Sequence, residues 1–282
     1  MNQTDNQEIN EVLAWRQDYE DRLRKDWGWL TVTGLHWIDE GVHRVGSAAD
    51  AEIPFAVEPS VPGHAASIIR EGNGVRLEVI EPGSVLKAGE PAVSGPLHFD
   101  GTQGERFEIG SQSFLVVRRG DRVGVRTWDN NSRQRSEYTG SDWFPVDPAL
   151  RVTATFSEFE EPRTIHWLNV IGDEKQSEVA GEWRFSLQGK ELALVSLTDS
   201  GGDPFFVIRD GTSGKETYGA SRFLKGTRTD GNTTVLDFNR AYNPPCAFTP
   251  HATCPLPPRE NVLDLRVEAG ELLYSWSPAE AV

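Results

Sequence analysis

The sequence predicts a mainly β protein that begins with one amphipathic helix. Apolar residues recur at three- and four-residue steps only near the N-terminus, and further along the chain the period changes to two. Glycine-bearing turns separate the alternating segments, as they do in antiparallel hairpins. We therefore expect a β-sandwich followed by a second antiparallel β-sandwich or barrel packed against it. The expected ranges are 1–40, 41–128 and 129–282.

The helix is expected over roughly residues 8–26. Ile9, Val12, Tyr19 and Leu23 share one face, and charged residues fill the positions between them. Gly28 interrupts this pattern, and a tryptophan-rich apolar segment follows it as far as the turn at 39–41. Packing into the core is the simplest role for these tryptophans.

Several strands are predicted by strict alternation or by short apolar runs bounded by turns. They lie at 75–79, 114–117, 165–171, 182–187 and 235–238. Turns that contain glycine are expected at 72–74, 188–190, 201–203, 230–232 and 269–270. This spacing is typical of antiparallel meanders.

Composition argues against several partners. The 282-residue chain has a formal net charge of −15, so nucleic acid and anionic membrane are poor partners. The N-terminus resembles no secretory signal, and no apolar run approaches the length of a membrane span. Two cysteines eight positions apart do not form a disulfide framework. We therefore expect a cytoplasmic protein.

Residues 41–128 resemble a forkhead-associated domain, a small β-sandwich that commonly binds phosphothreonine. The resemblance lies in Val45-Gly46-Ser47, then Asp50 to Ile53, then Gly63-His64-Ala65, followed by alternating strands. Ser47 stands where that family has arginine, and Val61 where it has serine. The resemblance therefore implies that phosphopeptide binding is lost and that His64 supports loop structure.

The second half resembles the bacterial and archaeal family catalogued as domain of unknown function 1684. The resemblance lies in Arg209 to Gly214, in Thr217 to Leu224 and in the segment LDFNRAYNPPCAFTPHATCPLPPREN, and we extend it over nearly the whole chain through Trp29 to Trp37. It implies no activity. It also implies a tyrosine at the position that His251 occupies here.

The late segment from Asp237 to Pro258 is the expected working surface. Six prolines stiffen this loop, and a rigid loop loses little entropy when it binds a ligand. An arginine, a phenol and amides can together hold an anionic or multiply hydroxylated small molecule. The candidate ligand-binding residues are Arg222, Arg240, Tyr242, Asn243, Asn239, Asp237 and Tyr218. The alternative is that the same polar side chains satisfy the backbone of the loop.

Cys246, His251 and Cys254 have a spacing that zinc could use, but they provide only three ligands. We expect no cofactor, and buried thiols or a local disulfide rank above zinc. A cysteine nucleophile with His251 as its base has no supporting local motif.

Two functional hypotheses follow. In the first, the C-terminal β-unit binds a polar or anionic small molecule, and whether it also turns that molecule over is left open. In the second, the chain is a protein-interaction module whose forkhead-associated-like half presents loops to a partner, and the late motif only stabilises the fold. A concave pocket that contains the candidate side chains would distinguish the first from the second.

Overall fold

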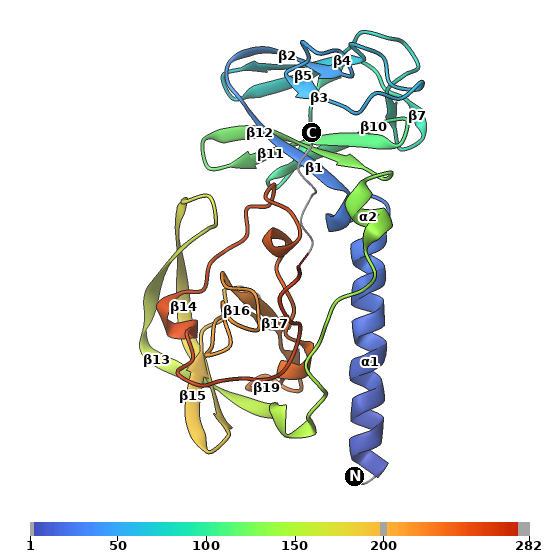
Figure 1. The fold of residues 1–282 in the computed structure, drawn as a ribbon. Helices are drawn as coiled ribbons and strands as arrows, with labels where there is room; N and C mark the ends of the chain where they lie inside the picture. The colour runs from blue at the N-terminus through green and yellow to red at the C-terminus, as the bar shows by residue number, and fades with distance from the viewer. Residues whose placement is uncertain (1–2, 198–201, 276–282) are drawn as a thin grey trace. The chain divides into compact units, whose positions relative to one another are not determined.

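The computed structural model describes residues 3–197 and 202–275, and the chain divides into two compact units. Unit 1 contains Met1–Arg22 and Thr139–Val282, whereas unit 2 contains Leu23–Tyr138 (Figure 1). The ranges expected from the sequence placed these boundaries elsewhere, at 40/41 and 128/129. The difference arises because most of the N-terminal helix packs in unit 1, while the tryptophan-rich segment pairs as a strand in unit 2.

The predicted N-terminal helix is confirmed as α1, Gln3–Arg24. Val12, Arg16, Tyr19 and Leu23 are its buried residues, and their spacing of three or four places them on one face. Trp27 then adopts a φ of 62°, which ends the helical path of the backbone.

Unit 2 is a β-sandwich of two sheets. The first sheet has the order β1-β12-β11-β10-β6-β7, with β9 paired to β10, and the second has the order β3-β2-β4-β5-β8. The strands are β1 Val32–Ile38, β2 Gly41–Gly46, β3 Ile53–Pro54, β4 Ala66–Glu71, β5 Gly74–Val79, β6 Leu86–Lys87, β7 Glu90–Pro91, β8 Gly95–Pro96, β9 Phe99–Asp100, β10 Gln103–Ile109, β11 Gln112–Arg119 and β12 Arg122–Asp129. The short helix α2, Arg133–Glu137, follows β12, and the 3-10 helix η1, Trp29–Thr31, precedes β1.

One apolar core joins the two sheets of unit 2. Ile68 and Leu77 from the second sheet are buried in the same cluster as Phe114 and Val125 from the first. The alternating residues 75–79 therefore form β5 as predicted, and the turn before it uses Gly72 at a φ of 57°.

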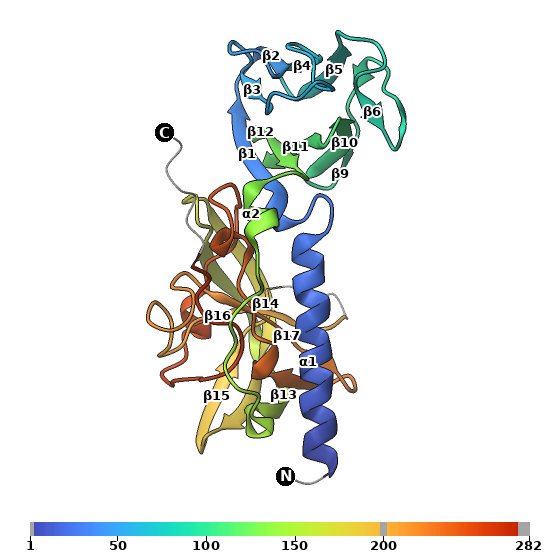
Figure 2. The same cartoon turned by 45° about the vertical axis from the view of Figure 1, so that its right-hand side comes forward.

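Unit 1 also contains open antiparallel sheets, one of five strands in the order β15-β14-β13-β19-β18 and one formed by β16 and β17. The sheets do not close into a barrel, which had been the alternative to a sandwich. The strands are β13 Arg151–Leu168, β14 Glu174–Leu187, β15 Lys190–Leu194, β16 Phe205–Ile208, β17 Arg222–Lys225, β18 Thr227–Arg228 and β19 Thr233–Asp237. Four 3-10 helices complete the described part of the unit: η2 Pro148–Leu150, η3 Phe238–Arg240, η4 Pro245–Ala247 and η5 Arg259–Asn261. Figure 2 shows α1 running beside the strands of this unit.

The core of unit 1 contains Trp183, Phe206, Leu236 and Phe238, which come from both sheets and from η3. β19 is central to this arrangement because it pairs with β13 on one side and with β18 on the other. The pairing with β13 extends to Asp237 at the end of β19, where the late polar segment begins, whereas β18 pairs only with Thr234 and Val235.

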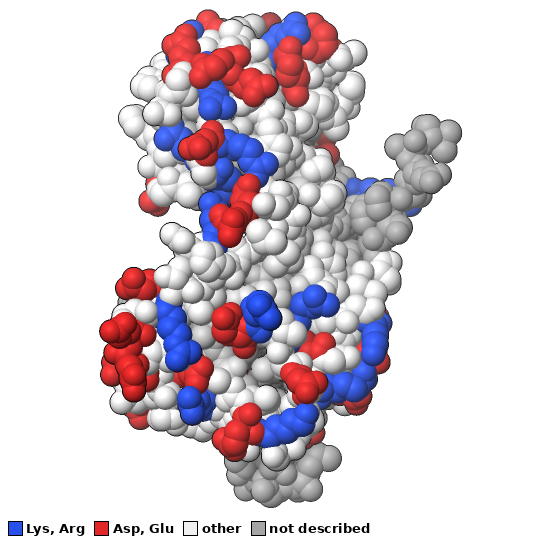
Figure 3. Space-filling view, turned by 90° about the vertical axis from the view of Figure 1, so that its left-hand side faces the viewer, with Lys and Arg blue, Asp and Glu red and all other residues white. Residues whose placement is uncertain are grey.

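In the described ranges no helix has the length and apolar character needed to cross a membrane. On the face drawn in Figure 3, lysine and arginine side chains lie among aspartate and glutamate side chains. The net negative charge of the chain is therefore not spread as one uniform acidic patch over that face.

Substitution of Gly46 tests how closely the backbone of unit 2 is packed. A Cβ at this position would lie 2.1 Å from the carbonyl oxygen of Gly63, so the backbone would have to move. Gly46→Ala should therefore lower the free energy of unfolding by about 1–3 kcal/mol, as overpacking does. Gly95→Ala is the control, because its Cβ would meet nothing within 4 Å. Urea denaturation of the full chain measures both variants, and equal stabilities would contradict the prediction.

Candidate functional site

The turn after β19 positions Asp237 and Arg240. The Asp237 carboxylate caps η3, because its Oδ1 accepts a hydrogen bond of 3.1 Å from the Asn239 N–H. Phe238 enters the core, and the N–H of Ala241 closes the turn on the carbonyl of Phe238. Arg240 is consequently left half-buried at the edge of the core.

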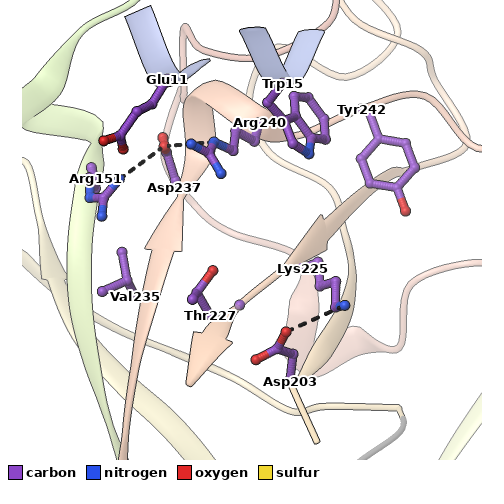
Figure 4. A pocket seen from close by; sticks show the side chains of 11 residues that line it. Glu11, Trp15, Arg151, Asp203, Lys225, Thr227, Val235, Asp237, Arg240 and Tyr242 are labelled. Atoms are coloured by element: carbon purple, nitrogen blue, oxygen red, sulfur yellow. Dashed lines mark ion pairs between the residues drawn. The ribbon is translucent and has the colours of Figure 1, made fainter. Parts of the chain in front are cut away.

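A pocket of about 350 Å³ opens at this turn, within unit 1. Its wall comes from α1, from the start of β13, from the residues just before β16, from the β17–β18 connection and from β19 with the residues that follow it. The residues that line it are Glu11, Trp15, Arg151, Asp203, Lys225, Gly226, Thr227, Val235, Asp237, Arg240 and Tyr242 (Figure 4). Three of the predicted site residues are therefore brought together: Asp237, Arg240 and Tyr242.

Ion pairs inside the pocket are long. Asp237 Oδ2 lies 3.4 Å from Arg240 Nε and 3.8 Å from Arg151 Nη1, and the Lys225 ammonium lies 3.4 Å from Asp203 Oδ2. Asp237 Oδ2 and Arg240 Nε are both buried, and neither makes a hydrogen bond to any described residue. The charges therefore attract one another while part of their hydrogen-bonding capacity stays unused.

Aromatic rings form another part of the wall. Trp15 and Tyr242 have ring centroids 5.9 Å apart, and Trp15 is also stacked on Tyr19 at 5.7 Å. Burial raises the pKa of Tyr242 to about 12, so its phenol keeps its proton at neutral pH and can donate a hydrogen bond.

Arg222 does not reach the pocket, although it was one of the predicted ligand-binding residues. Its side chain is fully buried and pairs with Asp210, with 2.5 Å between Arg222 Nη2 and Asp210 Oδ2. It also donates to the backbone carbonyls of Val267 and Ala269. Asp210 also forms an Asx-type turn, because its Oδ1 accepts from the Thr212 N–H at 2.8 Å, and the sequence did not reveal its ion pair with Arg222.

The two amides of the motif also make structural contacts. Asn239 joins the loop before η2, because its Oδ1 accepts from the Asp147 N–H at 2.9 Å and its Nδ2 donates to the Asp147 carbonyl at 2.8 Å. Asn243 Nδ2 donates to the carbonyl of Leu272 at 2.8 Å. Both amides lie outside the lining of the pocket.

Glu271 is a buried carboxyl group that the sequence analysis did not single out. Its Oε2 accepts from the Asn243 N–H at 2.6 Å and lies 3.0 Å from the Tyr19 hydroxyl of α1. Burial raises the pKa of Glu271 to about 7, although hydrogen bonds from Ser141, Asn243 and Tyr19 oppose the rise. A lone acidic residue near the C-terminus carries no sequence signal of such a role.

Tyr218 and the cysteines form a separate group. The Tyr218 hydroxyl donates to the Cys246 carbonyl at 3.0 Å, and burial raises the pKa of this phenol. Cys246 is half-buried and Cys254 is buried, with 3.3 Å between the Cys246 nitrogen and the Cys254 sulfur, and no disulfide joins them. In residues 3–197 and 202–275, no three His, Cys, Asp or Glu side chains converge as a metal site requires, so His251 does not complete one with the thiols.

His64 lies in the loop region of unit 2. Its Nε2 is 2.8 Å from Asp50, which is also 2.7 Å from the Arg44 guanidinium. The pKa of the Asp50 carboxyl is lowered, chiefly by the hydrogen bond from His64 and then by the charge of Arg44. These contacts join the loops that carry Asp50 and His64 to each other and to strand β2.

A sequence model of the family described as "Protein of unknown function (DUF1684)" matches residues 136–272, and the chain belongs to this family. The matched segment is about half of the chain, so the resemblance proposed over nearly the whole chain was too broad. It falls almost entirely in the second segment of unit 1. Every residue that lines the pocket belongs to it except Glu11 and Trp15 of α1.

Two solved structures resemble parts of the chain. The solution NMR structure of the uncharacterized protein from gene locus rrnAC0354 of Haloarcula marismortui is 32% identical, covers 49% of this chain and 79% of that chain, and has a TM-score of 0.40. The crystal structure of Rad53 1-466 in complex with AMP-PNP is 12% identical, covers 70% of this chain and 46% of that chain, and has a TM-score of 0.19. A search of curated proteins found no match.

Removal of Arg222 tests its structural role. Arg222→Met leaves the Asp210 carboxylate buried without its partner, so the free energy of unfolding should fall by about 3–5 kcal/mol. The double variant Arg222→Met/Asp210→Asn should recover part of this loss, because the uncompensated charge is gone. Arg184→Met is the matched control, since the Arg184 side chain is 64% exposed. Urea denaturation that found the Arg222 and Arg184 variants equally stable would refute this role.

Glu271 should make stability depend on pH. Its folded-state pKa of about 7 lies above the ordinary value of 4.5, so the folded chain holds the proton more tightly than the unfolded chain does. Stability should therefore fall as the pH rises from about 4.5 through 7, by roughly 3 kcal/mol for this group. Glu271→Gln removes the titrating group. The free energy of unfolding of this variant should therefore rise relative to that of the wild type as the pH increases from about 4.5 through 7. Urea denaturation at pH 5, 6, 7 and 8 measures both, and parallel profiles would contradict the prediction.

Proposed function

We propose that the pocket at the end of β19 binds a polar or anionic small molecule. The observation that carries the proposal is the cavity of about 350 Å³ that brings Asp237, Arg240 and Tyr242 of the late motif together. The Arg240 side chain is 27% exposed there, and its charged contact in the described residues is the long ion pair to Asp237. Its guanidinium therefore has donors to offer a ligand with polar or anionic groups.

Rigidity supports the proposal. Asp237 ends β19, where it pairs with Arg151 of β13, and its Oδ1 caps η3. Tyr242 pairs with Phe223 through backbone hydrogen bonds of 2.8 and 3.0 Å. Side chains held in this way lose little further entropy on binding, so more of the contact energy contributes to affinity.

The pocket favours small-molecule binding over the interaction-module hypothesis. That hypothesis gives the late segment only a role in stabilising the fold, which suits Arg222, Asn239 and Asn243, because all three are buried among structural partners. It does not account for Arg240, whose only charged contact in the described residues is a long ion pair at the edge of a cavity.

Substitution of Arg240 separates binding from stability. The side chain is 27% exposed and makes no close hydrogen bond in the described residues, so Arg240→Met should leave the melting temperature nearly unchanged. It should abolish the stabilisation that a matching ligand confers on the wild type in a thermal-shift screen of metabolites.

Arg184→Met serves as the control for the loss of one arginine charge and should keep the ligand response. The proposal fails if Arg240→Met unfolds the protein, or if it responds to the ligand as the wild type does. A wild type that responds to no metabolite in the screen also contradicts it.

A further inference from the structure

The charges that line the pocket are balanced. Its cations are Arg151, Lys225 and Arg240, and its carboxylates are Glu11, Asp203 and Asp237. A purely anionic ligand would approach the cations but would also meet a carboxylate beside each of them, since Asp237 lies near both arginines and Asp203 lies near Lys225. Like charges at such distances repel, and the repulsion is stronger where water is excluded.

The charged groups of the lining come as a donor next to an acceptor. The Arg240 guanidinium is a donor and the Asp237 carboxylate is an acceptor, with 3.4 Å between Arg240 Nε and Asp237 Oδ2. One hydroxyl group can accept a hydrogen bond from the guanidinium and donate one to the carboxylate, because a hydroxyl has both functions. An ionised carboxylate or a fully ionised phosphate only accepts, and an ammonium only donates, so neither serves both groups while the ion pair stays in place.

A second pair of a cation and a carboxylate lies elsewhere in the cavity, and both of its side chains are exposed. Lys225 and Asp203 lie 3.4 Å apart, on a different side of the view in Figure 4 from Asp237 and Arg240. A hydrogen bond from the backbone N–H of Arg228 is the chief cause that lowers the pKa of Asp203, so this residue remains an acceptor at neutral pH. Two such pairs suit a ligand with several hydroxyl groups.

Aromatic rings complete the lining. Trp15 and Tyr242 offer apolar ring surface beside the charged groups, with their ring centroids 5.9 Å apart. A ring-shaped or chain polyol has C–H faces that can pack on aromatic rings while its hydroxyl groups form hydrogen bonds. The cavity of about 350 Å³ lies at the small end of the range for ligand pockets, which is about 300–1,000 Å³.

We infer that the ligand of this pocket is a neutral, multiply hydroxylated molecule of the sugar or sugar-alcohol class. The inference rests on the proposed function and narrows it. Asp237 and Arg240 share one hydroxyl of the ligand, Asp203 and Lys225 share another, and Trp15 and Tyr242 pack against its carbon skeleton.

Isothermal titration calorimetry of the full chain tests this inference with three sets of probes. D-Glucose, D-galactose, myo-inositol and D-mannitol represent neutral polyols, glucose 6-phosphate and citrate represent anions, and glycine betaine and L-serine represent zwitterions. We expect a neutral polyol to bind with a Kd that changes less than about twofold between 50 and 500 mM NaCl, because screening affects charged ligands far more.

Two variants locate the binding. Asp237→Asn keeps the Oδ1 acceptor that caps η3 but replaces Oδ2 with a donor, so the Kd of the polyol should rise at least about tenfold. Tyr242→Phe keeps the ring and should weaken binding less. Arg184→Met should leave the Kd unchanged. If Asp237→Asn fails to fold by circular dichroism, Arg240→Met replaces it, with the same expected tenfold rise.

The outcomes separate the two proposals. If only the anions or only the zwitterions bind, and Arg240→Met abolishes that binding, the pocket is a ligand site but the polyol inference is wrong. If a polyol binds equally well to the wild type, to Asp237→Asn and to Arg240→Met, the site lies elsewhere and both proposals fail. Both also fail if no probe of any set binds.

Discussion

The buried ion pair between Arg222 and Asp210 is the interaction on which much of unit 1 depends. Both side chains are fully shielded from solvent, so each charge requires the other. Arg222 also donates to the carbonyls of Val267 and Ala269, which ties the last described segment to β17. That segment then continues to Glu271, which lies beside the late motif because the chain has already been anchored there.

Helix α1 depends on this arrangement in turn. Tyr19 meets Glu271 and the carbonyl of Asn243, while Arg16 donates to the carbonyl of Asn239 at 3.2 Å. These contacts set the position of the helix, and the helix supplies Glu11 and Trp15 to the pocket. Asn239 and Asn243 of the late motif therefore act on the pocket indirectly, because their backbone carbonyls hold the helix that forms part of its wall.

The sequence distinguished the polar residues of the late motif from the apolar residues of the core. It did not show which of these polar residues stabilise the fold and which line a pocket. Arg222 begins β17 and Arg240 follows β19, so their positions in the sequence are alike. Arg222 is nevertheless fully buried against Asp210, whereas Arg240 lies at the rim of a cavity. Arg151, Lys225 and Asp203 were not foreseen as lining residues, because each lies in an ordinary strand or loop with no motif around it. What these three residues share is that the fold places them around the same pocket.

Local patterns determined α1, the alternating strands such as β5 and β14, and the glycine turns between them, because periodicity is set by neighbouring residues. The rigid, polar character of the segment after β19 was also evident from its prolines and charges. Tertiary structure decided that Arg16 of α1 reaches Asn239, 223 positions away, and that Glu271 is buried against Asn243. Burial of a charge and the closing of a pocket depend on which distant segments pack together, and the local order of residues does not contain that information.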